Sequence, residues 1–139
     1  MTTIPVALTA NGYQIRVERG ILSRAGEEIA AVTKARRAAL ISDSQVGPLY
    51  ASKVKESLEK AGFTVHTVNF PAGEANKTDA TLHMLYDVLL SWGMTRGDAV
   101  VALGGGVVGD TAGYAAATLF RGMDCIQIPT RLMAQVGSS

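Results

Sequence analysis

The chain has 139 residues, of which 47% are hydrophobic and 18% charged, so its composition excludes disorder and fits a single domain with a substantial core. Thirteen Lys and Arg residues against twelve Asp and Glu residues give a formal net charge of +1 with no basic stripe, which argues against a nucleic-acid partner, and one cysteine excludes an internal disulfide. No segment reaches the ~18 consecutive apolar residues of a membrane helix or shows a secretory signal, so we expect a soluble, cytoplasmic protein without membrane contact.

The N-terminal part of the sequence predicts a β-hairpin followed by a weakly amphipathic helix. Residues 13–17 alternate like a half-exposed strand, and we expect them to pair with residues 4–8 across a turn at Asn11-Gly12. An apolar helix face around Ile29 comes next.

Beyond this hairpin, short apolar strands alternate with helices. The expected strands are 38–42, 63–70, 99–103 and 124–128. The expected helices begin at Gly47-Pro48, Thr78 and Thr111 and end at Gly62, Gly93 and Leu119. This alternation indicates a Rossmann-like α/β fold, a mostly parallel sheet with helices on both faces. We treat residues 1–139 as one domain, in which residues 131–139 begin an element that the chain does not complete.

The glycine run after the third of these strands is the clearest functional signal. Gly104, Gly106 and Gly109 satisfy G-x-G-x-x-G, and a strand that runs through glycines into a helix offers free backbone N–H groups to an anion. The pattern alone is weak, because the usual dinucleotide fold carries it at the first strand, with an acid about 20 residues later. Three consecutive glycines exceed what a tight turn needs, so we favour a phosphate-binding loop.

Polar residues at two other strand ends allow more than one interpretation. Asp43, at the end of the strand 38–42, either accepts hydrogen bonds from a ribose or caps the next helix, and its position does not separate the two. Glu74 and Lys77 lie three residues apart before a helix, where spacing alone favours a solvated capping region.

The remaining candidates are weaker still. A lone Arg121 is typical of a surface or interface cation. His66 and His83 lie on separate elements without flanking ligands, so we expect no metal site within this chain. We place Cys125 in the core.

Taken in order, five segments strongly resemble the 3-dehydroquinate synthase family. They are Asp43-Ser44-Gln45, Gly73-Glu74-Ala75-Asn76-Lys77, the run from Val101 to Asp110, Phe120-Arg121-Gly122 and Ile128-Pro129-Thr130. The resemblance covers nearly the whole chain and is most specific between residues 99 and 130. It implies an N-terminal α/β nucleotide-binding domain, without the family's C-terminal helical domain.

The resemblance also implies an activity and its cofactors. The family is a lyase of the shikimate pathway, which leads to chorismate and the aromatic amino acids. It converts 3-deoxy-D-arabino-heptulosonate 7-phosphate into 3-dehydroquinate and phosphate, with bound NAD and a zinc or cobalt ion. Its metal ligands lie beyond Ser139, so we expect this chain alone to be inactive and the complete enzyme to be a homodimer.

Residue roles carry over by motif. The residues implied for NAD, from the adenosine end through the ribose and pyrophosphate to the nicotinamide side, are Asp43, Ser44, Gln45, Glu74, Lys77, Gly105, Gly106, Val107, Asp110 and Thr130. Arg121 is implied to bind the substrate phosphate of the neighbouring subunit, and no catalytic residue is implied within this chain.

The sequence departs from the family pattern at two positions. Arg131 stands where a second threonine is usual, and Gly137 stands where the family has an acid of the substrate site. Two alternatives stay open, another sugar-phosphate cyclase and a stand-alone nucleotide-binding module. Iron-containing or glycerol-type dehydrogenases share the fold, but the segments 73–77 and 120–122 fit them poorly.

Overall fold

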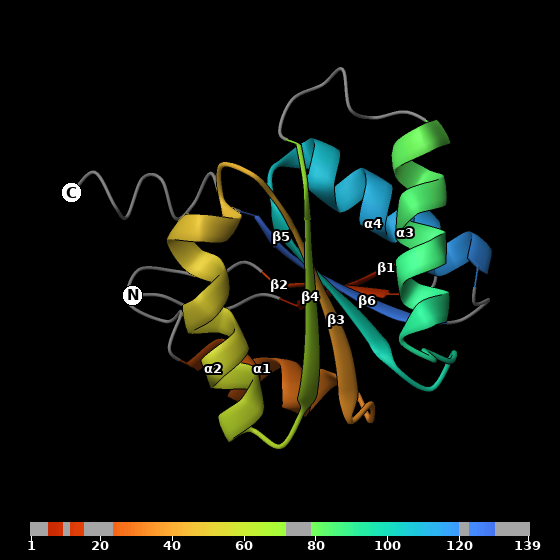
Figure 1. Cartoon of the computed structure of the whole chain (residues 1–139). Helices are drawn as coiled ribbons and strands as arrows, with labels where there is room; N and C mark the ends of the chain where they lie inside the picture. The colour runs from red at the N-terminus through yellow and green to blue at the C-terminus, as the bar shows by residue number, and fades with distance from the viewer. Residues whose placement is uncertain (1–5, 10–11, 16–23, 72–78, 120–122, 130–139) are drawn as a thin grey trace.

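The computed structural model describes residues 6–9, 12–15, 24–71, 79–119 and 123–129, which form a six-stranded sheet with helices on both faces (Figure 1). The strands are β1 (Val6–Thr9), β2 (Gly12–Ile15), β3 (Arg37–Asp43), β4 (Thr64–Phe70), β5 (Ala99–Gly104) and β6 (Asp124–Pro129). The helices are α1 (Ala25–Val32), α2 (Ser52–Lys60), α3 (Asp79–Ser91) and α4 (Gly106–Leu119), and a π-helical turn, η2 (Gly47–Ala51), leads into α2. The predicted α/β fold is confirmed.

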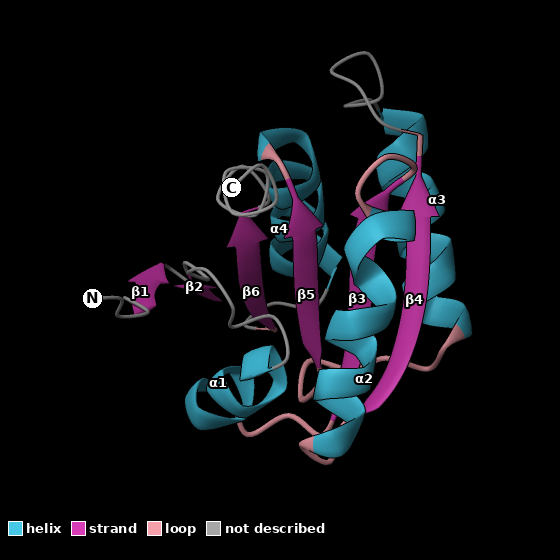
Figure 2. Cartoon of the chain, turned by 90° about the vertical axis from the view of Figure 1, so that its left-hand side faces the viewer, coloured by secondary structure: helices cyan, strands magenta, loops and turns pink. Residues whose placement is uncertain are grey.

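The strands follow the spatial order β1-β2-β6-β5-β3-β4. Strands β3, β4, β5 and β6 are parallel, and Figure 2 shows all four pointing the same way. The predicted hairpin is confirmed as the antiparallel pair β1 and β2. It also extends the main sheet, because β2 pairs in parallel with β6.

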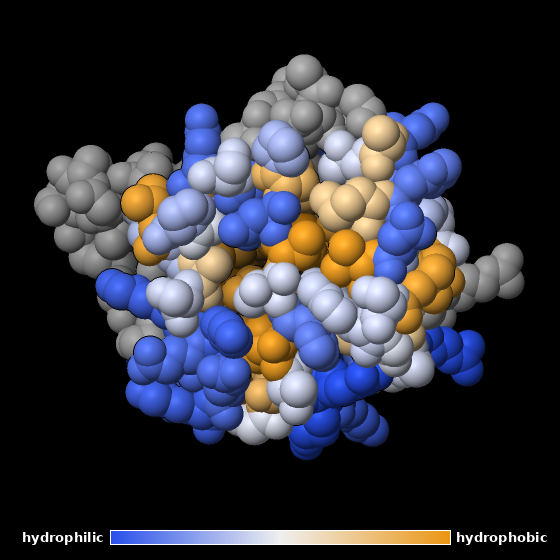
Figure 3. Space-filling view, in the orientation of Figure 1, coloured by the Kyte–Doolittle hydropathy of each residue, from blue (hydrophilic) through white to orange (hydrophobic). Residues whose placement is uncertain are grey.

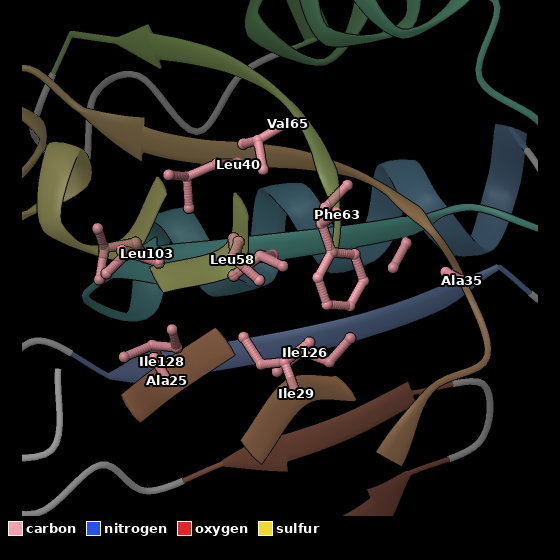
Figure 4. Packing of buried hydrophobic residues seen from close by; sticks show 14 residues of the cluster. Ala25, Ile29, Ala35, Leu40, Leu58, Phe63, Val65, Leu103, Ile126 and Ile128 are labelled. Carbon is pink, nitrogen blue, oxygen red and sulfur yellow. The ribbon is translucent and has the colours of Figure 1, made fainter. Parts of the chain in front are cut away.

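The helices pack on the two faces of the sheet through two hydrophobic cores. Leu40 of β3 packs with α1 and α2, whereas the next residue, Ile41, packs with α3 and α4. Figure 4 shows the first core, where Leu40, Leu58 and Ile126 lie between the sheet and its helices. Burying such a side chain stabilises the fold by ~1.5–3 kcal/mol, which explains why the central strands are apolar on both faces.

The helices present opposite sides to the core and to solvent. Val54 and Leu58 of α2 are fully buried, and hydrophilic side chains gather over the outer side of that helix (Figure 3). Leu85 and Leu89 of α3 are also fully buried. Within the part of the chain that the structure describes, no helix is both long enough and apolar enough to cross a membrane.

The helix predicted over residues 111–119 is confirmed, but α4 begins before Thr111. We expected this helix from Thr111, but it begins at Gly106, inside the glycine run. Glycine and valine have low helix propensity, so local preference alone disfavours a helix at residues 106–109. Tertiary packing overrides that preference here, because Val108 is buried in the core and Gly109 lies against Gln127 of β6.

Candidate functional site

The chain reverses its direction of winding between two neighbouring parallel strands, β3 and β5. From β3 the chain continues to β4, toward one edge of the sheet, and from β5 it continues to β6, toward the opposite edge. The segments after β3 and β5 therefore lead to opposite faces, to α2 and to α4 respectively. In open α/β sheets, ligands bind at the carboxyl ends of the strands at such a switch point. Asp43 and Gly105, two of the predicted site residues, follow these two strand ends.

The turn from β5 into α4 contains two glycines with different roles. A Cβ on Gly104 would lie only 2.6 Å from Val108 Cγ2, so the close approach of α4 requires glycine there. Gly105 is exposed, and a Cβ on it would meet no heavy atom of the described residues within 4 Å. Only Gly62 and Gly93 among the described glycines have positive φ, so backbone conformation does not require glycine at position 105 either. The packing of the described residues therefore explains glycine at position 104 but not at position 105.

The start of α4 presents backbone donors beside Gly105. The N–H of Gly109 donates to the carbonyl of Gly105 at 3.0 Å, which is the first hydrogen bond of the helix ladder. The N–H groups of Gly106, Val107 and Val108 precede it and have no acceptor within the helix. Together with the helix dipole, these donors favour an anion. Asp110 is exposed one turn into the helix.

Asp43 orders the turn that follows β3, but it does not cap the next helix, because η2 has Val46 as its N-cap residue and no side-chain cap. Its Oδ1 accepts hydrogen bonds from the backbone N–H of Gln45 at 3.0 Å and of Val46 at 2.7 Å. No hydrogen bond to Asp43 Oδ2 is made by the residues described. The N–H of Ser44 donates to the carbonyl of Phe70 at 2.9 Å, which ties this loop to β4. The turn therefore uses one carboxylate oxygen of Asp43 and fixes the loop at the switch point.

Two polar residues near the glycine turn were missed in the sequence. Ser42 is fully buried, and its Oγ donates to the carbonyl of Leu103 at 2.7 Å. Gln127 Nε2 donates to the carbonyl of Gly109 at 3.2 Å. The available signal was a polar residue inside each of two otherwise apolar strands, but a sequence does not show which group such a residue contacts.

The structure does not place every predicted site residue. It gathers Asp43, Ser44, Gln45, Gly105 and the start of α4 at one edge of the sheet. The side chain of Val107 and the surroundings of Gly106 are not described. Outside the described residues lie Glu74, Lys77, Arg121, Thr130, Arg131 and Gly137.

Other reactive side chains lie away from this edge. The described residues include no group of three or more His, Cys, Asp and Glu side chains that could hold a metal ion. His66 stacks on Trp92 with ring centroids 4.9 Å apart. Cys125 is in the core, as predicted, and its burial, with a smaller effect of Asp124, raises the pKa of the thiol from 9.0 to about 12. At neutral pH this thiol is protonated and therefore a poor nucleophile.

Several known proteins are similar to this chain in sequence. The 3-dehydroquinate synthase of Latilactobacillus sakei is 47% identical over 139 residues, which is 100% of this chain and 39% of that protein. The 3-dehydroquinate synthase of Streptococcus thermophilus is 48% identical over 136 residues, 98% of this chain and 38% of that protein. The chain thus spans about two fifths of the length of these relatives.

A solved relative shows the same fold with ligands. The 2-deoxy-scyllo-inosose synthase in complex with carbaglucose-6-phosphate, NAD+ and Co2+ is 30% identical, with a TM-score of 0.76 over 92% of this chain and 35% of that chain. Residues 67–139 match the family described as 3-dehydroquinate synthase N-terminal. This match covers more than half of the chain. The 3-dehydroquinate synthases of Latilactobacillus sakei and Streptococcus thermophilus are similar to it over 98–100% of its length. The chain therefore belongs to the 3-dehydroquinate synthase family.

Proposed function

We propose that residues 1–139 form the NAD-binding domain of a 3-dehydroquinate synthase, with the NAD pyrophosphate between Gly105 and the start of α4. The observation that carries this proposal is the open space beside Gly105. Neither contacts with the described residues nor the backbone conformation requires glycine at this position. A solved relative that contains NAD+ supports it, because that protein is similar over 92% of this chain.

The geometry of the switch point supports roles for further residues in binding NAD. Backbone N–H groups at Gly106 and Val107 donate hydrogen bonds to the pyrophosphate, and Asp43 Oδ2, which the turn after β3 leaves unused, accepts hydrogen bonds from ribose hydroxyls at the adenosine end. Ser44 and Gln45 lie beside it.

The other roles rest on the family resemblance. Glu74 and Lys77 hold ribose hydroxyls and nearby groups, whereas Asp110 and Thr130 reach the nicotinamide side. Arg121 binds the substrate phosphate across a homodimer interface.

In the complete protein, we propose conversion of 3-deoxy-D-arabino-heptulosonate 7-phosphate to 3-dehydroquinate and phosphate, in the cytoplasm. Bound NAD supplies a hydride acceptor that each turnover regenerates, while this chain's residues bind and orient it. The zinc or cobalt ion is held by residues of the complete protein that this chain does not span. A cyclase for another carbocycle is the second candidate, but 47% identity to 3-dehydroquinate synthase against 30% to 2-deoxy-scyllo-inosose synthase favours the first.

The test is a calorimetric titration of the whole chain with NAD, comparing Gly105→Ala with Gly113→Ala. A methyl group at position 105 occupies the space of the pyrophosphate, so affinity falls by roughly tenfold or more. A Cβ on Gly113 makes an ordinary contact, 3.6 Å from Gln127 Nε2, so this control keeps the affinity. Equal affinities in the two variants would refute the assignment of the loop.

A further inference from the structure

We infer that Ser42 and Gln127 are positioning residues, which fix the nucleotide-binding turn from the two strands that flank β5. The inference rests on the proposed function, since it concerns the turn that would hold the pyrophosphate. Neither residue is among those that the family resemblance assigns to NAD.

Ser42 takes over where the backbone ladder between β3 and β5 stops. The last paired residues of these strands are Ile41 and Ala102. One residue further on, Ser42 Oγ donates to the carbonyl of Leu103, the residue immediately before Gly104. Ser42 has 0% exposure, so losing this bond would leave the carbonyl without its buried donor. The side chain thus continues the attachment of β5 to β3 up to the glycine turn.

Gln127 holds the other side of the turn, from β6. Its amide lies against α4, because a Cβ on Gly109 would be only 3.1 Å from Gln127 Oε1. Gln127 Nε2 donates to the carbonyl of Gly109, and the backbone N–H of Gly109 donates to the carbonyl of Gly105. A movement of Gly109 therefore moves Gly105. Through these two bonds, Gln127 sets where the first turn of α4 lies.

These contacts matter because glycines are conformationally permissive. A run of three glycines without such contacts samples many backbone conformations, and ordering it on ligand binding would cost affinity. Anion binding by backbone N–H groups depends on donors that already point to the right place. Ser42 and Gln127 supply that order before the ligand arrives.

The test uses Gln127→Leu, which keeps the approximate size of the side chain and removes its hydrogen bond. The matched control is Thr118→Val, which removes a hydroxyl that donates to the carbonyl of Tyr114 at 2.7 Å at the other end of α4. Two quantities are measured on the whole chain: amide hydrogen exchange at Gly109 without ligand, and NAD affinity by calorimetry. Gln127→Leu should speed exchange at Gly109 by about fivefold and weaken NAD binding by a similar factor, whereas Thr118→Val changes neither.

The two measurements separate this inference from the proposed function. If the unmodified chain does not bind NAD, the proposed function fails, and exchange at Gly109 alone decides whether Gln127 fixes the turn. If Gln127→Leu lowers the melting temperature but leaves exchange at Gly109 and NAD affinity at their original values, Gln127 is merely structural and the inference is overturned. Ser42→Ala should act in the same direction on both, and the Gln127 variant decides alone if Ser42→Ala does not fold.

Discussion

Gly104 and Val108 are in such close contact that a Cβ on Gly104 would lie 2.6 Å from Cγ2 and 2.8 Å from Cβ of the valine. The contact joins the last residue of β5 to the first turn of α4, where Val108 is 1% exposed. Strand and helix can therefore meet at this distance only through glycine.

We expect Gly104→Ala to destabilise the fold, because overpacking of this kind costs ~1–3 kcal/mol. The measurement is the free energy of unfolding in urea. Gly105→Ala is the control, since its Cβ meets no described atom within 4 Å, and it should change stability by less than about 0.5 kcal/mol. Equal losses in both variants would contradict the difference between the two glycines.

A second prediction concerns Arg37, which ties the start of β3 to the segment before β5. Its Nη2 lies 2.7 Å from Asp98 Oδ2, and its guanidinium also donates to the carbonyls of Trp92 and Gly93. Because Asp98 is 8% exposed, Arg37→Met leaves a nearly buried carboxylate without its cation. The arginine is itself partly exposed, so we expect a loss of about 1–2 kcal/mol rather than the full cost of a buried pair.

A double-mutant cycle with Asp98→Asn checks this pair. Coupling between the two positions should exceed about 0.5 kcal/mol, and additive effects would show that the ion pair contributes nothing measurable. The carbonyl contacts of Arg37 remain in the Asp98→Asn background, which separates them from the ion pair.

The sequence was sufficient for the alternation of strands and helices, because buried parallel strands are apolar on both faces and helix ends carry glycine. It was not sufficient for the start of α4. Local propensity argues against a helix at Gly106, and the contacts that override it involve Val108 with the core and Gln127 on a later strand. The pairing of Arg37 with Asp98 was equally unreadable, because 61 positions separate the two.

For the candidate site, Asp43 and the glycines could be identified because they follow the carboxyl ends of predicted strands. How these residues lie relative to one another could not be predicted in this way. That relation depends on the strand order, in which β3 lies between β4 and β5 and therefore places Asp43 next to the glycine turn. Ser42 and Gln127 stayed hidden, because polar residues within strands show no partner until the neighbouring strands and helices are placed.

A third prediction concerns pH. The pKa of Cys125 is raised from 9.0 to about 12 in the folded chain, so the folded state holds the thiol proton more tightly than the unfolded state does. The resulting stabilisation is complete below about pH 9 and is lost as the pH rises toward about 12. In Cys125→Ala, the free energy of unfolding should therefore fall less steeply over this range than in the unmodified chain. Equal slopes would contradict the raised pKa.

The last prediction separates the two roles of Asp43. Asp43→Asn keeps an oxygen that can accept the N–H groups of Gln45 and Val46, so the melting temperature should stay within error. It removes the negative charge that would face a ribose, and losing a charged hydrogen bond of ~1.5–3 kcal/mol weakens NAD binding by roughly tenfold to a hundredfold. Asp43→Ala removes the hydrogen bonds to the Gln45 and Val46 N–H groups as well, and should lower stability by about 1 kcal/mol in addition. Calorimetry and thermal unfolding of the same two variants distinguish the roles. If Asp43→Asn binds NAD as tightly as the unmodified chain, the carboxylate only fixes the turn after β3, and the adenosine end of NAD lies elsewhere along the switch point.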